Sequence, residues 1–260
     1  MSRQRILAVV GVVVVGFLGL GFSLELGGAA HEVLLGDPGT VVRWGTPIAK
    51  FLVSASMALV IGGLAVRLFA VPPGPAANRV GTLTLAAAIV WSFAMVAYAF
   101  FTFLTVYGAP ASVDAGFDAS LQYFLTETDL GHLLIIITAM VAIVTLLLAL
   151  TRSWFWSAAT FLLAVATAWP FAEMSHSGGT ASHGIAVSAL VLHLVFVSMW
   201  TGGLVAAIVA MAAGADRSTV LHRYSSIALL SISIVAITGV ASAVVRIGSW
   251  DKLVSAYGII

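Results

Sequence analysis

The sequence predicts an all-α fold: a polytopic transmembrane helix bundle of about seven spans with its N-terminus inside the cell. Three observations predict this class. Of the 260 residues, 61% are apolar and only 8% are charged, whereas soluble proteins carry about 25% charged residues because their surfaces must be solvated. The mean hydropathy is +1.13. The apolar residues also fall into runs of about 20, the length that crosses a bilayer as a helix.

The apolar runs define the expected spans in chain order. They are 6–24, 46–71, 80–107, 131–150, 154–172, 184–213 and 225–246. Charged residues mark boundaries of the later runs: Arg67 lies near the end of the second, Arg79 directly precedes the third, Asp129 precedes the fourth, Arg152 follows it, and Arg217 and Arg223 precede the seventh. Because the spans occupy nearly the whole chain, we expect residues 1–260 to form a single membrane domain with no soluble domain.

The first run follows the basic residues Arg3 and Arg5, a pattern that signal peptides share. We interpret it as a retained anchor, and cleavage near residues 27–30 is the alternative. Cytoplasmic segments of membrane proteins are enriched in Lys and Arg. With the N-terminus inside, seven of the eleven basic residues fall on the inner side and nine of the ten acids on the outer side. The charges therefore predict an N-terminus inside and a C-terminus outside.

Three features inside this framework bear on packing. The connection 108–129 has spaced apolar residues and acids but no Lys or Arg, and two structures are open for it: a helix along the outer surface or an ordinary solvated loop. Trp91 and Trp200 fall in mid-span and are expected to pack against neighbouring helices. Gly-Gly-Leu occurs at 62–64 and again at 202–204. Paired small residues let helices approach closely in lipid, and a decayed internal repeat is the alternative reading.

Composition excludes several functions. The chain has no Cys, which removes disulfides, thiolate metal sites and covalent haem attachment. Its net charge of +1 gives no basic surface for nucleic acid. The sequence contains no GxxxxGK[ST], HExxH or DKTGT pattern, so ATP-driven pumping within this chain is excluded on motif grounds. We expect a protein that is not an enzyme.

Histidines gather on the predicted outer side. His31, His132, His176 and His183 fall in or beside outer segments, His193 lies in the outer half of 184–213, and only His222 lies inside. The densest cluster is the Gly- and Ser-rich connection 173–183, which holds Met174, His176 and His183. Imidazole binds many transition metals and thioether sulfur favours Cu(I). The alternative is a polar loop whose histidines contact only water.

His193 is the most informative single residue, because an ionisable group within a span is costly and normally faces the bundle interior. His132, one residue into the fourth span, lies at the same outer level. Three outcomes are open for this pair: both bind one metal ion, both bind a haem iron, or they share no ligand. A neutral histidine that hydrogen-bonds across helices is an equally open reading of His193.

The sixth and seventh spans carry a resemblance to a known family. The stretch His193 to Leu204, with Trp200, Gly202 and Gly203, resembles the His-Leu…Trp-x-Gly-Gly-Leu helix of the CopD family of bacterial copper-resistance membrane proteins. The stretch from Arg223 to Ala228 and the pair Thr238-Gly239 resemble that family's next helix. The resemblance is closest over 190–260 and looser over 40–190. In the family a further helix normally follows, so the end at Ile260 suggests a truncated product.

The resemblance implies a multi-pass protein of the bacterial cytoplasmic membrane that moves copper inward or supplies it to cuproproteins. Its implied partners are the lipid bilayer, the copper ion, and a copper-binding protein outside the membrane or a cytochrome oxidase assembly factor. Two alternatives stay open: a b-type haem electron carrier with His132 and His193 as axial ligands, and a non-transporting assembly subunit. On the copper reading, Met174, His176 and His183 capture the ion, and His132 and His193 pass it into the bundle.

Overall fold

The computed structural model describes residues 36–151, 153–174 and 183–247, together with Gly19, Gly21 and Glu25. Within these ranges the regular elements are α-helices. They are α2 (Thr40–Phe69), α3 (Pro75–Tyr107), α4 (Ala115–Glu127), α5 (Asp129–Leu150), α6 (Trp154–Ala166), α7 (Ala168–Met174), α8 (His183–Ala212) and α9 (Arg217–Ile247). The all-α class is confirmed.

Six helical segments of the described chain are long and apolar enough to cross a membrane. They correspond to the last six expected spans, with bounds that differ by a few residues, the largest difference being that α9 begins at Arg217 rather than 225. The first expected span, 6–24, lies outside the described residues except for Gly19 and Gly21. The inside position of the N-terminus stays a prediction.

One expected span is not a continuous helix. The run 154–172 consists of α6 and α7, which are separated at Thr167. Pro170 has no N–H to donate to the carbonyl four residues earlier, that of Ala166, so the regular hydrogen-bond ladder is interrupted there. At the same break, the Thr167 hydroxyl donates a hydrogen bond to the Ala164 carbonyl at 2.6 Å.

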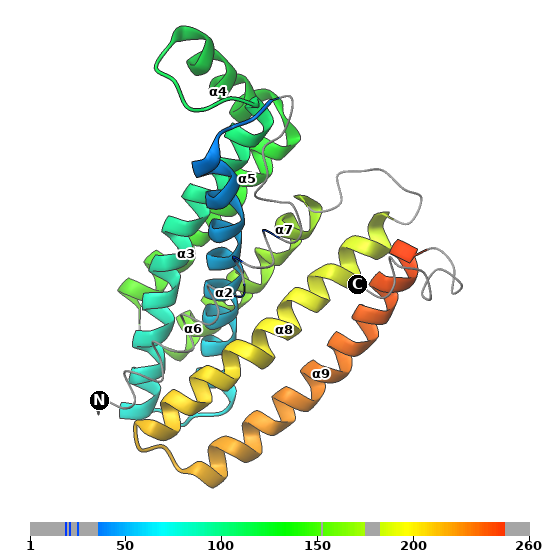
Figure 1. Cartoon of the computed structure of the whole chain (residues 1–260). Helices are drawn as coiled ribbons and strands as arrows, with labels where there is room; N and C mark the ends of the chain where they lie inside the picture. The colour runs from blue at the N-terminus through cyan, green and yellow to red at the C-terminus, as the bar shows by residue number, and fades with distance from the viewer. Residues whose placement is uncertain are drawn as a thin grey trace.

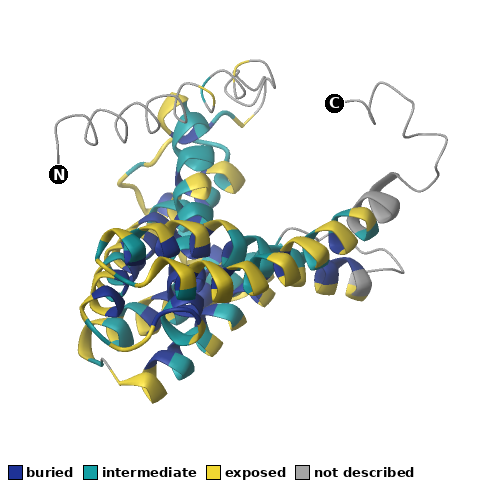
Figure 2. Ribbon diagram, turned by 90° about the horizontal axis from the view of Figure 1, so that it is seen from below, coloured by how far each residue is buried: buried dark blue, intermediate teal, exposed yellow. Residues whose placement is uncertain are grey.

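Helix α2 lies at the centre of the bundle and packs against α3, α8 and α6. Helix α5 lies on the other side of α3, and α8 and α9 run side by side in opposite directions along one flank (Figure 1). Buried residues gather where the helices meet, and exposed residues lie on the outward sides of the ribbons (Figure 2). Many of the exposed residues are large and apolar, for example Phe93 and Leu229, as expected for helices that face lipid.

The two Gly-Gly pairs meet in space. A Cβ added to Gly62 would lie 2.1 Å from the Gly203 nitrogen, and one added to Gly202 would lie 1.8 Å from the Ala58 carbonyl oxygen. Helices α2 and α8 therefore cross with their backbones in contact. Gly63 makes the equivalent approach to α3, where an added Cβ would lie 2.3 Å from the Thr84 hydroxyl. Close helix packing therefore accounts for both Gly-Gly pairs, and no internal repeat is needed to explain them.

The connection 108–129 contains a helix, α4, rather than an ordinary loop; its position along the outer surface of the membrane stays a prediction. Asp114 caps it by accepting a hydrogen bond from the Phe117 N–H at 2.9 Å. Phe117 and Phe124 are buried against Phe103 of α3, with ring centroids 5.4 and 5.3 Å apart. This aromatic cluster fixes α4 across the ends of α3 and α5 (Figure 1).

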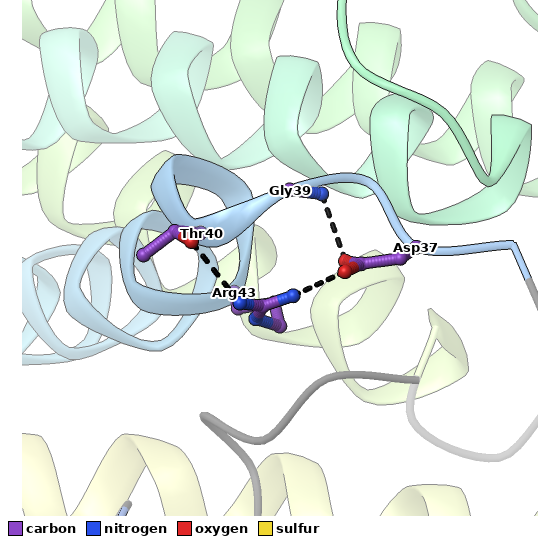
Figure 3. A network of polar contacts seen from close by, with 4 residues as sticks. All are labelled: Asp37, Gly39, Thr40 and Arg43. Atoms are coloured by element: carbon purple, nitrogen blue, oxygen red, sulfur yellow. Dashed lines mark hydrogen bonds and ion pairs between the residues drawn. The ribbon is translucent and has the colours of Figure 1, made fainter. Parts of the chain in front are cut away.

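A network of polar contacts lies at the N-terminal end of α2 (Figure 3). Asp37 accepts a hydrogen bond from the Gly39 N–H at 2.9 Å and forms an ion pair with Arg43, which also donates to the Thr40 hydroxyl at 3.0 Å. Gly39 has φ +91, a conformation that favours glycine. The Gly39 N–H, and then Arg43, hold the pKa of the Asp37 carboxyl below its usual range despite some desolvation.

The expectation for the mid-span tryptophans is confirmed at Trp91, whose side chain is fully buried in the larger core cluster. Its indole Nε1 has no hydrogen-bond partner among the described residues. Trp200 is half-buried, and its carbonyl accepts a hydrogen bond from the Tyr224 hydroxyl at 2.7 Å. This bond ties α9 to α8 close to the glycine crossing.

Candidate functional site

The candidate site lies between α8 and α9. His193 is half-buried on α8, and its Nδ1 lies 3.1 Å from the Oγ1 of Thr238 on α9. The candidate membrane span of α8 is Ala186–Ala212, and His193 lies seven residues along it from Ala186, about 10 Å at 1.5 Å per residue. An ionisable side chain at this depth is costly unless it has a polar partner, and Thr238 supplies one.

Thr238 determines which nitrogen of the ring carries the proton. Its hydroxyl donates to the Ile234 carbonyl at 2.8 Å and also lies 3.2 Å from the Val235 carbonyl, so its one proton is used within α9. Oγ1 can then only accept from His193, which requires the Nδ1–H tautomer of the neutral ring. This tautomer follows from the hydrogen-bond network. It leaves Nε2 with a lone pair, the form in which imidazole binds a metal ion.

Gly239 lies beside the same ring. A Cβ added there would lie 3.9 Å from the Cε1 of His193, an ordinary van der Waals distance, so this position borders the imidazole without crowding it. The sequence presents His193 and Thr238-Gly239 as two separate motifs 45 residues apart. The structure brings them into one contact. Sequence reasoning missed the role of Thr238 as the partner of His193, although a hydroxyl in the next span is a usual partner for a buried imidazole.

Further polar groups follow the same face of α9. Ser231 is fully buried, and its hydroxyl has no hydrogen-bond partner among the described residues. It lies seven residues from both Thr238 and Tyr224, so all three share one side of the helix. A buried hydroxyl without a partner is costly. The α8–α9 interface therefore carries an unused polar group about 10 Å deeper than Thr238.

The other predicted ligands lie at the same end of the bundle but on different elements. His132 is exposed in the first turn of α5, where its Nε2 lies 2.9 Å from the Thr126 carbonyl. Met174 is the last residue of α7, partly buried against the larger core cluster, and His183 is the first residue of α8. His176 lies outside the described residues.

The hydrogen bonds described for His132 and His193 go to other residues, the Thr126 carbonyl and the Thr238 hydroxyl, and not to another candidate ligand. Helix α7 packs against α8, whereas α5 packs against α3, α4, α6 and α7 and is not among the helices that pack extensively against α8. In the part of the chain that the structure describes, no group of three or more His, Asp or Glu side chains is placed to hold a metal ion. His193 is thus the candidate whose surroundings are best defined.

Comparison with known proteins adds one finding. The family model of the copper resistance protein D-like N-terminal domain matches residues 41–187. This match covers α2 to the start of α8, where the motif resemblance is looser, and it ends before His193. No curated protein and no solved structure matches the chain. Because the matched residues make up more than half of the chain, this integral membrane protein belongs to the copper resistance protein D-like family.

Proposed function

We propose that this protein handles copper as its cargo, by transport across the cytoplasmic membrane or by delivery at it, and that His193 is a ligand on the path. The observation that carries the proposal is the pairing of His193 Nδ1 with Thr238, which leaves Nε2 with its lone pair within a candidate membrane span. Family membership supports copper as the ion. Neutral imidazole and thioether are ligands that suit copper, Cu(I) in the case of sulfur.

The path begins at the connection between α7 and α8. Met174 ends α7 and His183 begins α8, so with His176 between them they supply one thioether and two imidazoles for capture. His132 adds an imidazole at the outer end of α5. From His183 to His193 is ten residues of helix, about 15 Å. Few, exchangeable ligands at each step favour movement, because an ion must bind well enough to enter and weakly enough to leave.

Copper analysis of the purified protein, together with its visible spectrum, tests the role of His193. Wild type, His193→Ala and His222→Ala are compared; His222 is exposed near the other end of α9 and serves as the matched control. We expect near-stoichiometric copper in wild type and His222→Ala, and weakened or absent copper in His193→Ala. Equal copper in all three variants contradicts the proposal.

The same spectrum separates the alternatives. A Soret band lost in His193→Ala would identify a b-type haem protein. Neither copper nor haem would favour a non-transporting assembly subunit. For the capture step, we expect the double variant His176→Ala/His183→Ala to lower copper uptake by cells at unchanged expression. Unchanged uptake would remove the capture step from the path.

A further inference from the structure

A second feature lies on the opposite side of α3 from α8. A groove of about 460 Å³ runs between α3 and α5 and ends beneath α4. Its lining includes Val96, Phe100, Leu121, Ile135 and Ala139. We propose that this groove holds one hydrocarbon chain of a phospholipid from the leaflet on the α4 side, and that the lipid carries an amine headgroup such as ethanolamine.

The apolar lining of the groove favours a hydrocarbon chain as its ligand. All the lining side chains are apolar except that of Thr138, and its hydroxyl donates to the Leu134 carbonyl of its own helix at 2.7 Å. No side-chain hydrogen-bonding group of the lining is therefore free to receive a polar ligand. A polar molecule would lose its hydrogen bonds to water on entry without replacement. An alkyl chain loses none, and it gains packing contacts along the groove.

The shape of the groove admits a chain from the lipid. Val96 and Ile135 are 57% and 47% exposed on the outward sides of α3 and α5, so the groove is open where a bilayer surrounds the bundle. At the end nearest α4, Leu121, Phe124 and Leu125 close over it. From Val96 to Phe103 the lining covers seven residues of α3, about 10 Å, a large part of one leaflet of a hydrocarbon core about 30 Å thick.

The negative charge around α4 favours a lipid headgroup that carries an ammonium group. Residues 108–129 contain Asp114, Asp118, Glu127 and Asp129 but no Lys or Arg. Asp118 is exposed and lies three residues before Leu121 and seven before Leu125, so it is on the face of α4 that borders the groove. A headgroup at this level is attracted if it carries an ammonium group. A headgroup with only a phosphate charge is repelled.

The test measures which lipids remain bound to the protein. Protein reconstituted in bilayers of equimolar phosphatidylethanolamine and phosphatidylglycerol is extracted with detergent, purified and examined by native mass spectrometry. We expect bound phospholipid in wild type, with ethanolamine lipid enriched at least several-fold. Ala139→Trp fills the groove and is expected to lose this lipid. Ala236→Trp, an equal change at an exposed site on α9, is expected to retain it.

Asp118→Asn tests the headgroup separately: it should keep a bound lipid but lose the ethanolamine preference. Equal lipid in wild type and Ala139→Trp would overturn the proposal, as would a second copy of the chain bound in place of lipid. Ala142→Phe, at another lining position, repeats the test if Ala139→Trp does not fold. Copper content should be unchanged in all these variants, so this proposal and the proposed function can fail independently.

Discussion

Gly62 of α2 and Gly202 of α8 meet with no side chain between them, and each lies where the backbone of the other helix leaves no room for a Cβ. The neighbouring glycines extend the contact to other helices. Gly63 faces Thr84 of α3, and Gly203 faces the Tyr224 ring of α9. Four helices are thus joined within one turn of α2 and one turn of α8.

Gly202→Ala is expected to destabilise the fold, because its Cβ would overlap the Ala58 carbonyl and the two helices would have to separate. Overpacking of this kind costs about 1–3 kcal/mol of unfolding free energy. Denaturation of the detergent-solubilised protein measures it. Gly184→Ala is the matched control, since none of the described atoms lies within 4 Å of an added Cβ there. Equal stability of both variants would show that α8 does not cross α2 at these residues.

Thr238→Val is expected to weaken copper binding about 10–100-fold, the usual effect of removing the outer partner of a histidine ligand. Valine keeps the size of the side chain but cannot accept the Nδ1–H of His193. Thr238→Ser keeps the hydroxyl and should bind copper as wild type does. Competition with a chromophoric Cu(I) chelator gives the affinities. If Thr238→Val and Thr238→Ser bind equally well, the hydroxyl has no part in positioning the ring.

The start of α2 is expected to weaken in acid. The pKa of Asp37 in the folded protein lies below its ordinary value of 3.8, held there first by the Gly39 N–H and then by Arg43. A lowered pKa stabilises the fold above the unfolded value, and this contribution is lost as the pH falls through the folded value.

Hydrogen exchange in the first turn of α2 measures this contribution. Above about pH 5, Asp37→Asn should exchange faster there than wild type, and the difference should shrink as the pH approaches and passes below 3.8. The first turn of α9, capped by Asp216, provides an internal control. A difference that persists undiminished in strong acid would argue against the carboxylate as its source.

Trp91→Phe is expected to cost little, less than about 1 kcal/mol of unfolding free energy, although the side chain is fully buried. The reason is that the substitution also removes an indole N–H that has no partner among the described residues, and leaving such a donor buried costs about 1–3 kcal/mol. Trp91→Ala, which leaves a cavity, should cost about 3–5 kcal/mol. Similar losses in the two variants would indicate that the N–H is bonded after all.

The sequence predicts the spans well because burial in lipid imposes length and composition on each helix directly. Charges at the ends of the runs locate their boundaries to within a few residues, apart from the start of α9. The break at Thr167 was missed, since Pro170 lies close to the expected end of that span and its effect reaches back four residues. The connection 108–129 was left undecided because α4 depends on a tertiary contact between Phe117 and Phe103.

The site was predicted only in part, for a related reason. The family resemblance and the intramembrane position of the imidazole single out His193, but neither specifies its partner. The Thr238 contact depends on how α8 and α9 pack, which periodicity does not determine. The other proposed ligands lie on three elements and on a connection outside the described residues, so His132, Met174, His176 and His183 stay predictions.

The glycine crossing also has a mechanical consequence. The backbone contact at Gly202 is a fixed point about which α8 could tilt. His193 lies nine residues from it along the helix, about 14 Å. A tilt of about 10° moves His193 by about 2 Å. Figure 1 shows α8 and α9 leaning away from α3 toward the N-terminal end of α8. Because Thr238 is hydrogen-bonded to His193, a tilt of α8 together with α9 would move the two residues as a pair, and the imidazole would change its distance from α2 and α7 while keeping its orientation.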